Sequence, residues 1–183
     1  LNELALTTME LLAGQFTSGK VKTKLDRAEA LPRVTGDPDR LQQVIINLVL
    51  NAVQAMPDGG RLRVATGMVR RARPGLEDGA AQDFVFLEVG DSGAGIPEEI
   101  RDKIFDPFFT TREGQGGTGL GLAVCSGIVK EHDGWIEIVD SAEGDSVSAE
   151  GGAPHGTVFR VFLPVATEGS TTGSHAAIAR PSA

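Results

Sequence analysis

The sequence predicts a single α/β domain, and three observations carry that prediction. The 183 residues are 40% hydrophobic and 23% charged, which is the size and composition of one ordinary globular domain with a core. Short strand-like segments and longer helical segments occur along the same chain. Glycine- and proline-rich turns separate them, and no segment repeats another. Such a domain is long enough to be an enzyme.

Three segments have the apolar spacing of helices. Residues 1–16 show it loosely and begin without a capping residue, so we expect them to be the end of something longer. Asp37 is a suitable N-cap, and the proline after it suits the first position of a helix over residues 38–56. A third helix is predicted over residues 120–133, ended by Gly134 in the left-handed conformation.

Five segments have the composition of strands. They are residues 21–25, 61–67, 83–91, 135–140 and 156–164. Two of the connections, residues 70–82 and 141–155, are predicted to be long loops. The tail, residues 166–183, is small and polar, and we expect it to be disordered.

Charge and cysteine content exclude several classes of protein. The net charge of −8 and the pI near 4.9 argue against a basic nucleic-acid-binding domain. The single cysteine, Cys125, excludes an internal disulfide framework and fits a reducing, cytoplasmic compartment. Its place on a helix favours a role in the core over one as a nucleophile. There is no signal peptide and no apolar run of about 18 residues, so we expect no membrane contact by this chain.

A glycine run, GQGGTGLGL at residues 114–122, raises the question of what it holds. It contains the spacing GxGxxG, but that fingerprint needs a strand directly before it, and the preceding DPFFTTREG has no strand pattern. A dinucleotide site is therefore disfavoured. The run leads into the helix predicted at residue 120, so its amides and the helix N-terminus can face phosphate oxygens, as in a closing lid.

The helix predicted over residues 38–56 carries two amides in apolar surroundings. Asn47 and Asn51 stand four residues apart and therefore lie on one stripe of the helix, flanked by Gln43 and Gln54. An unpaired buried amide costs about 1–3 kcal/mol, so both side chains need partners. Either they bond to a neighbouring loop, or they offer oxygen atoms to a hard cation such as Mg²⁺.

Two further motifs lie between this helix and the glycine run. In DSGAG, Asp91 can accept a hydrogen bond from an exocyclic amine, while Gly93 and Gly95 allow a sharp turn close to a ligand. In IFDPFFTTR, residues 104–112, three phenylalanines surround a proline. Taken alone, the first motif is more typical of a structural turn and the second of a hydrophobic plug.

These four motifs, in this order, resemble the N, G1, F and G2 boxes of bacterial sensor histidine kinases. The resemblance is to their ATP-binding catalytic domain, covers residues 17–165, and is closest in wording to the subgroup of nitrogen-regulation kinases. It implies a two-layer α/β sandwich, the Bergerat fold, with a mixed β-sheet covered on one face by helices and a flexible ATP lid. It also implies ATP and Mg²⁺ as cofactors.

The resemblance assigns roles to individual residues. Asn51 would ligate Mg²⁺, Asn47 would lie beside the phosphates, and Asp91 would bind the adenine amino group. Arg112 stands where many relatives have lysine and would contact a phosphate, so that Asn47, Asn51 and Arg112 form the expected catalytic set. The other expected ATP-binding residues are Gly93, Gly95, Ile96, Phe105, Thr110, Thr111, Gly117, Thr118, Gly119, Leu120, Gly121, Leu122 and Thr157.

A substrate histidine is missing from the expected domain. None of the three histidines lies in the HE or HD context of a phosphoacceptor. The resemblance therefore implies that residues 1–16 are a remnant of the connection to an upstream dimerisation and phosphoacceptor hairpin, which would receive the γ-phosphoryl group. A response regulator receiver domain would be the next partner. The fragment would be monomeric and its parent homodimeric, and whether the parent is anchored in a membrane stays open.

Two other functions remain open. Related ATPases of the gyrase and chaperone type hydrolyse ATP with a glutamate four residues before the metal-binding asparagine. In this chain that residue is Asn47, which cannot act as a general base. The sequence therefore favours phosphoryl transfer over hydrolysis. A nucleotide-sensing module without transfer activity would carry the same motifs.

Overall fold

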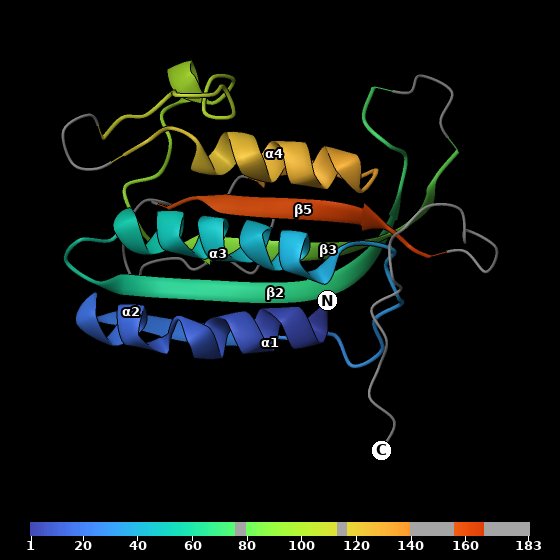
Figure 1. Ribbon diagram of the computed structural model, residues 1–183, viewed down its shortest axis with the longest axis horizontal. Helices are drawn as coiled ribbons and strands as arrows, with labels where there is room; N and C mark the ends of the chain where they lie inside the picture. Colours follow the sequence, from blue (N-terminus) through green and yellow to red (C-terminus); the bar gives the residue numbers. More distant parts are fainter. Residues whose placement is uncertain (76–79, 113–116, 140–155, 167–183) are drawn as a thin grey trace.

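The chain forms a two-layer α/β sandwich (Figure 1). The computed structural model describes residues 1–75, 80–112, 117–139 and 156–166. One layer is a sheet with the strand order β1-β2-β3-β5-β4. The strands are β1 (Val21–Asp26), β2 (Gly60–Arg71), β3 (Gln82–Asp91), β4 (Trp135–Val139) and β5 (Val158–Pro164). Because β1 pairs in parallel with β2 and the other neighbours pair antiparallel, the sheet is mixed, as predicted.

The second layer consists of helices on one face of the sheet (Figure 1). They are α1 (Asn2–Leu11), α2 (Ala13–Ser18), α3 (Pro38–Gln54) and α4 (Gly121–Glu131), with a short 3-10 helix, η1 (Glu98–Ile100), before α4. Alternate residues of the central strand β3, Val85, Leu87 and Val89, are buried in the core between the two layers. The predicted fold class is confirmed.

Local capping explains where α3 begins. The Asp37 carboxylate accepts hydrogen bonds from the backbone N–H groups of Asp39 (2.9 Å) and Arg40 (3.2 Å), as predicted for an N-cap. The backbone N–H of Asp37 in turn donates to Nε2 of His132 (2.9 Å), the residue that follows α4. Nδ1 of this buried histidine lies 2.7 Å from the carbonyl oxygen of Ile128, so the ring joins the start of α3 to the end of α4.

Two local predictions are wrong. The left-handed residue after α4 is Asp133 (φ 54°), whereas Gly134 is constrained by space, because a Cβ there would lie 2.2 Å from a carbonyl oxygen of β5. Residues 70–82 are not entirely loop, since β2 and β3 extend into both ends of this segment. An ion pair between Arg71 and Glu137 of β4 (2.9 Å) helps to hold the extension against the sheet.

Both ends of the described chain contact the sandwich. At the N-terminal end, α1 contacts α3 and buries Ala5 completely. At the other end, Ala166 donates a backbone hydrogen bond to Arg33 (2.8 Å); the rest of the predicted tail and the predicted loop at 141–155 lie outside the described residues. The division of the chain after residue 16 stays a prediction. Within the part that the structure describes, no helix is long and apolar enough to cross a membrane.

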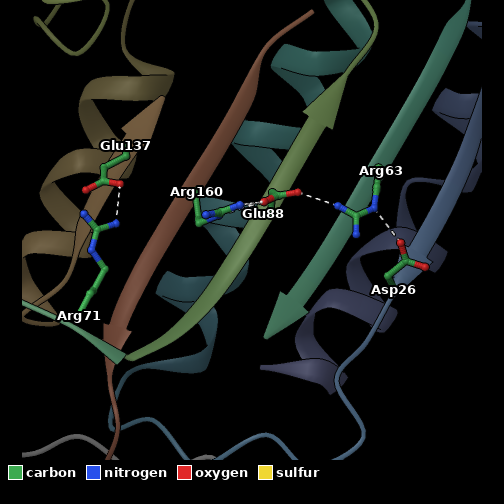
Figure 2. A network of polar contacts seen from close by, with 6 residues as sticks. All are labelled: Asp26, Arg63, Arg71, Glu88, Glu137 and Arg160. Atoms are coloured by element: carbon green, nitrogen blue, oxygen red, sulfur yellow. Dashed lines mark hydrogen bonds and ion pairs between the residues drawn. The ribbon is translucent and has the colours of Figure 1, made fainter. Parts of the chain in front are cut away.

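The other face of the sheet carries a row of ion pairs (Figure 2). Glu88 on β3 is nearly buried and lies between Arg63 of β2 (2.7 Å) and Arg160 of β5 (2.9 Å to Nε). Arg63 also donates to Asp26 of β1 (2.7 Å), and this hydrogen bond lowers the pKa of the Asp26 carboxyl. A buried carboxylate without a partner would be strongly destabilising, so the two arginines favour one register of these four strands.

Candidate functional site

Four chain segments meet at one end of the sandwich, on the left in Figure 1. They are the last turns of α3, the first turn of α4, the end of β3, and the connection between β3 and α4. All residues expected to bind a nucleotide are among the described ones, and they lie on these segments or directly before β5. The structure therefore brings the four sequence motifs to one end of the molecule.

The asparagine stripe of α3 faces the start of α4. The Nδ2 group of Asn47 donates to the carbonyl oxygen of Gly121 (3.4 Å), and a Cβ on Gly121 would lie 3.8 Å from Nδ2 of Asn51. Asn47 thus has a protein partner, as the structural interpretation of this amide required. No described residue hydrogen-bonds the half-buried side chain of Asn51. The oxygen of Asn51 is therefore available to a ligand.

Cys125, one turn further along α4, lies in the core as predicted. It is 0% exposed, and its sulfur lies 3.8 Å from the carbonyl oxygen of Val44 on α3. Burial raises the pKa of the thiol to about 11, although a hydrogen bond with the Asn47 side chain opposes the rise. The group is therefore a neutral thiol near neutral pH and not a nucleophile.

Asp91 ends β3 with a nearly buried carboxylate. Its Oδ1 accepts hydrogen bonds from the backbone N–H groups of Gly93 (2.8 Å) and Thr157 (3.3 Å). Burial raises the pKa of this carboxyl, and the two hydrogen bonds oppose the rise. No described residue donates to Oδ2. The second oxygen can therefore accept a hydrogen bond from the amino group of a ligand.

Two positions around Asp91 require glycine. A Cβ on Gly93 would lie 2.5 Å from the carbonyl oxygen of Ala55, just after α3. Gly156 has φ +125°, and a Cβ there would lie 2.0 Å from the carbonyl oxygen of Asp91. Gly156 was not among the expected residues, although a glycine directly before the expected Thr157 was a visible signal.

The phenylalanine motif is only partly a hydrophobic plug. Ile104 is buried, and Phe105 packs edge-on against Phe159 of β5 with 6.3 Å between ring centroids. Phe108, in contrast, is 74% exposed, and its backbone N–H donates to the carbonyl oxygen of Gly119 (2.9 Å). A Cβ on Gly119, which has φ +67°, would lie 2.3 Å from the backbone of Phe108. The end of the glycine run is therefore anchored on the phenylalanine motif.

Arg112 reaches from the same connection to the end of α3. Its backbone N–H donates to Oγ1 of Thr110 (3.1 Å), and Gly117 packs against both residues. Its guanidinium donates to the side-chain oxygen of Gln54, the last residue of α3. This partner was not expected, although Gln54 lies three residues after Asn51 on the same stripe.

The remaining expected residues surround these groups. Ile96 and Leu122 are half-buried against the core, and Gly95 has a left-handed backbone (φ +76°). The exposed members of the set are Thr111, Gly117, Thr118 and Leu120. Residues 114–116 of the glycine run lie outside the described residues. A contact of each of these side chains with a nucleotide stays a prediction.

A sequence comparison decides the family. The profile of the family described as "Histidine kinase-, DNA gyrase B-, and HSP90-like ATPase" matches residues 36–167. The chain belongs to this family. Within it, the sensory histidine kinase/phosphatase NtrB of Rhodobacter capsulatus is 41% identical over 142 residues, which are 77% of this chain and 36% of NtrB. The sensor histidine kinase ZraS of Escherichia coli is 37% identical over 165 residues, which are 90% of this chain and 30% of ZraS.

Solved structures agree with the sequence relatives. The catalytic domain of the histidine kinase ThkA has a TM-score of 0.67 and 31% identity, covering 90% of this chain and 94% of that domain. ThkA in complex with the response regulator protein TrrA gives a TM-score of 0.64 and 30% identity, covering 91% of this chain and 40% of that one. The resemblance to histidine kinase catalytic domains is confirmed. The chain spans only about a third of the length of NtrB and ZraS.

Proposed function

We propose that the chain binds Mg-ATP and transfers the γ-phosphoryl group to a histidine on a separate dimerisation domain of a two-component sensor kinase. One observation carries the proposal: the end of β3, with Asp91, and the end of α3, with Asn51, lie at the same end of the sandwich (Figure 1), and each residue has an oxygen that no described residue hydrogen-bonds. A carboxylate oxygen suits the amino group of adenine. An amide oxygen suits a hard cation on the phosphates.

Adenine would bind beside Asp91. The backbone N–H groups of Gly93 and Thr157 hold Oδ1, so Oδ2 is the atom presented to the base. It would accept from the adenine amino group and repel the O6 atom that guanine has in the same place. Gly93 and Gly95 would leave room for the ring, because neither carries a side chain.

Mg²⁺ would be held by Asn51 together with water and the nucleotide. The described residues contain no group of three or more His, Cys, Asp or Glu side chains that could hold a metal ion, so a cation here would depend on the amide oxygen and phosphates. A bound ion would neutralise charge on the phosphates. The backbone N–H groups at Gly119 and at the start of α4 would face the phosphate oxygens.

The histidine that receives the phosphoryl group would come from another domain. Both ring nitrogens of the buried His132 are engaged by backbone groups, and His155 and His175 lie outside the described residues. Asn47 replaces the glutamate that would activate water in the related ATPases, and an amide cannot serve as that base. Positioning and charge neutralisation would then favour transfer to the histidine nitrogen over hydrolysis.

The same proposal includes the domain organisation and the partners of the parent kinase. Residues 1–16 would connect to an upstream dimerisation and phosphoacceptor hairpin, and residues 17–165 would be the catalytic domain. The 41% identity to NtrB supports a parent of the nitrogen-regulation type. The complex of ThkA with TrrA supports a response regulator receiver domain as partner. The fragment would be monomeric, its parent a homodimer with this domain in the cytoplasm, and no nucleic acid would be a partner.

Radiolabelled ATP tests the reaction. The chain alone, the phosphoacceptor hairpin of its parent alone and the mixture of the two are incubated with Mg²⁺ and [γ-³²P]ATP. We expect acid-labile label on the hairpin in the mixture and in neither single sample. Rapid release of phosphate by the chain alone would indicate an ATPase instead. Nucleotide binding without any label on the hairpin would indicate a nucleotide-sensing module.

A further inference from the structure

Gln54 ends the asparagine stripe of α3. It follows Asn51 by one helical turn and Asn47 by two, so the three side chains project from one side of the helix. Gln54 is exposed, whereas the two asparagines are half-buried. The stripe therefore leads from the contact with α4 to the surface at the end of α3, where the Arg112 side chain arrives.

Hydrogen bonds hold both the backbone and the guanidinium of Arg112. Its backbone N–H donates to Oγ1 of Thr110 (3.1 Å). Gly117 packs so tightly here that a Cβ would lie 2.5 Å from Oγ1 of Thr110 and 3.0 Å from the carbonyl oxygen of Arg112. At the other end, Nη1 of the guanidinium donates to Oε1 of Gln54. Since the backbone is fixed on one side, Gln54 determines where the positive charge lies.

The partner of this guanidinium is a neutral amide. An amide oxygen occupies one of the five N–H donors and leaves the positive charge in place, whereas a carboxylate would neutralise it. Among the described residues, no acidic side chain pairs with Arg112. The charge therefore remains available to an anion, and it lies one helical turn beyond Asn51.

We propose that Gln54 is a positioning residue of the nucleotide site, which holds the Arg112 guanidinium beside Asn51 so that it contacts the phosphate oxygens of bound Mg-ATP. This inference deepens the proposed function and rests on it. Arg112 contacts the ligand, and Gln54 acts only through Arg112. The hydrogen bond between the two side chains is exposed, so replacement of either residue tests the contact without disturbing the core.

Titration of Mg-ATP and of adenosine into the native chain and its variants tests the positioning role. Gln54→Ala and Arg112→Ala should each weaken Mg-ATP binding about 3- to 10-fold, as expected for a partly exposed hydrogen bond to a charged group. The double variant should bind as Arg112→Ala does, because the two residues act as one unit. Gln54→Glu should also weaken Mg-ATP binding, since the new carboxylate neutralises the guanidinium and repels phosphate. Adenosine, which has no phosphate, should bind equally to all variants.

Gln43→Ala is the matched control, because Gln43 is an exposed glutamine in the first half of the same helix. It should bind Mg-ATP as the native chain does. Native affinity in Gln54→Ala, fully additive losses in the double variant, or an equal loss of adenosine affinity would each overturn the positioning role. Failure of the native chain to bind Mg-ATP would instead overturn the proposed function, and the positioning role with it.

Discussion

Replacement of Asp91 by asparagine should separate nucleotide affinity from stability. The carboxylate holds the backbone N–H groups of Gly93 and Thr157 through Oδ1, and an asparagine can keep both hydrogen bonds through its own oxygen. Its NH₂ group then takes the place of Oδ2 and directs a donor at the amino group of adenine. Loss of a hydrogen bond to a charged group is worth about 1.5–3 kcal/mol, so ATP affinity should fall about 10- to 150-fold.

The stability of the empty protein should change in the opposite direction near neutral pH. Burial raises the pKa of Asp91, so the folded state binds its proton more readily than the unfolded state. Below its ordinary pKa this carboxyl is protonated in both states and does not change the stability. As the pH rises from the ordinary pKa to the raised pKa, the unfolded state loses the proton first, and the folded state loses stability relative to it. Asparagine avoids this loss. Asp91→Asn should therefore unfold at a higher temperature than the native chain at neutral pH, and the difference should shrink towards about pH 4.

Two measurements test the predicted affinity and stability of Asp91→Asn. Thermal unfolding without nucleotide at both pH values gives the stability, and displacement of a fluorescent adenine nucleotide by ATP or GTP gives affinity and base preference. The native chain should prefer ATP, because Oδ2 of Asp91 would repel the O6 atom of guanine. Equal affinity for ATP and GTP, or normal ATP affinity in Asp91→Asn, would refute the adenine assignment. A lower unfolding temperature of the variant at neutral pH would refute the reasoning from burial.

Two further substitutions probe the metal and the turn. Asn51→Ala should abolish the Mg²⁺ dependence of ATP binding, because the Asn51 side-chain oxygen is the expected metal ligand. Titration of ATP with and without EDTA measures this dependence. Metal-independent affinity of the native chain would contradict the assignment. Gly156→Ala should lower the free energy of unfolding by at least about 2 kcal/mol, because φ is +125° and the new Cβ would lie 2.0 Å from the carbonyl oxygen of Asp91. Gly127→Ala on α4, where nothing lies within 4 Å of an added Cβ, should instead be neutral or stabilise by up to about 1 kcal/mol. Denaturant unfolding measures both glycine variants. Equal losses of unfolding free energy in Gly156→Ala and Gly127→Ala would contradict the requirement for glycine at position 156.

Local signals in the sequence predicted where the helices and strands lie better than they predicted which residues contact one another. Asp37 and the proline after it mark the start of α3 correctly, because N-capping depends on neighbouring backbone groups alone. The conformation of Gly134 could not be predicted in this way. Its backbone is constrained by a carbonyl oxygen of β5, far along the chain, and the left-handed residue is the preceding Asp133. The same holds for Glu88, whose burial depends on arginines from two other strands.

In the candidate site, too, local placement could be predicted from the sequence and long-range contacts could not. The residue types and their order predicted that Asp91 ends a strand and that Asn51 lies on a helix, since each belongs to a short motif that forms one turn or one helix. The partners Asn47 with Gly121 and Arg112 with Gln54 could not be predicted, because these pairs are 74 and 58 residues apart. They meet only when α4 and the preceding connection pack against α3.

The packing of α3 against α4 has a consequence for binding. His132 joins the two helices at one end through Asp37, and Asn47 joins them at the other end through Gly121, with the fully buried Cys125 between. The separation between the asparagine stripe and the N-terminus of α4 is therefore set by the protein before a ligand arrives, which would lower the ordering cost of the proposed binding of phosphate and cation.

The proposed adenine side depends on a different set of contacts, those of Asp91 with Gly93, in the turn after β3, and with Thr157, directly before β5. These contacts belong to the sheet and not to the helix pair. Because none of Asp91, Gly93 and Thr157 hydrogen-bonds a described residue of α3 or α4, the contributions of the two halves to affinity should be nearly independent. The loss in Asp91→Asn should then add to the loss in Gln54→Ala, whereas the losses in Gln54→Ala and Arg112→Ala should not add. A strong coupling between Asp91 and Gln54 would mean that the whole site closes as one unit around the nucleotide.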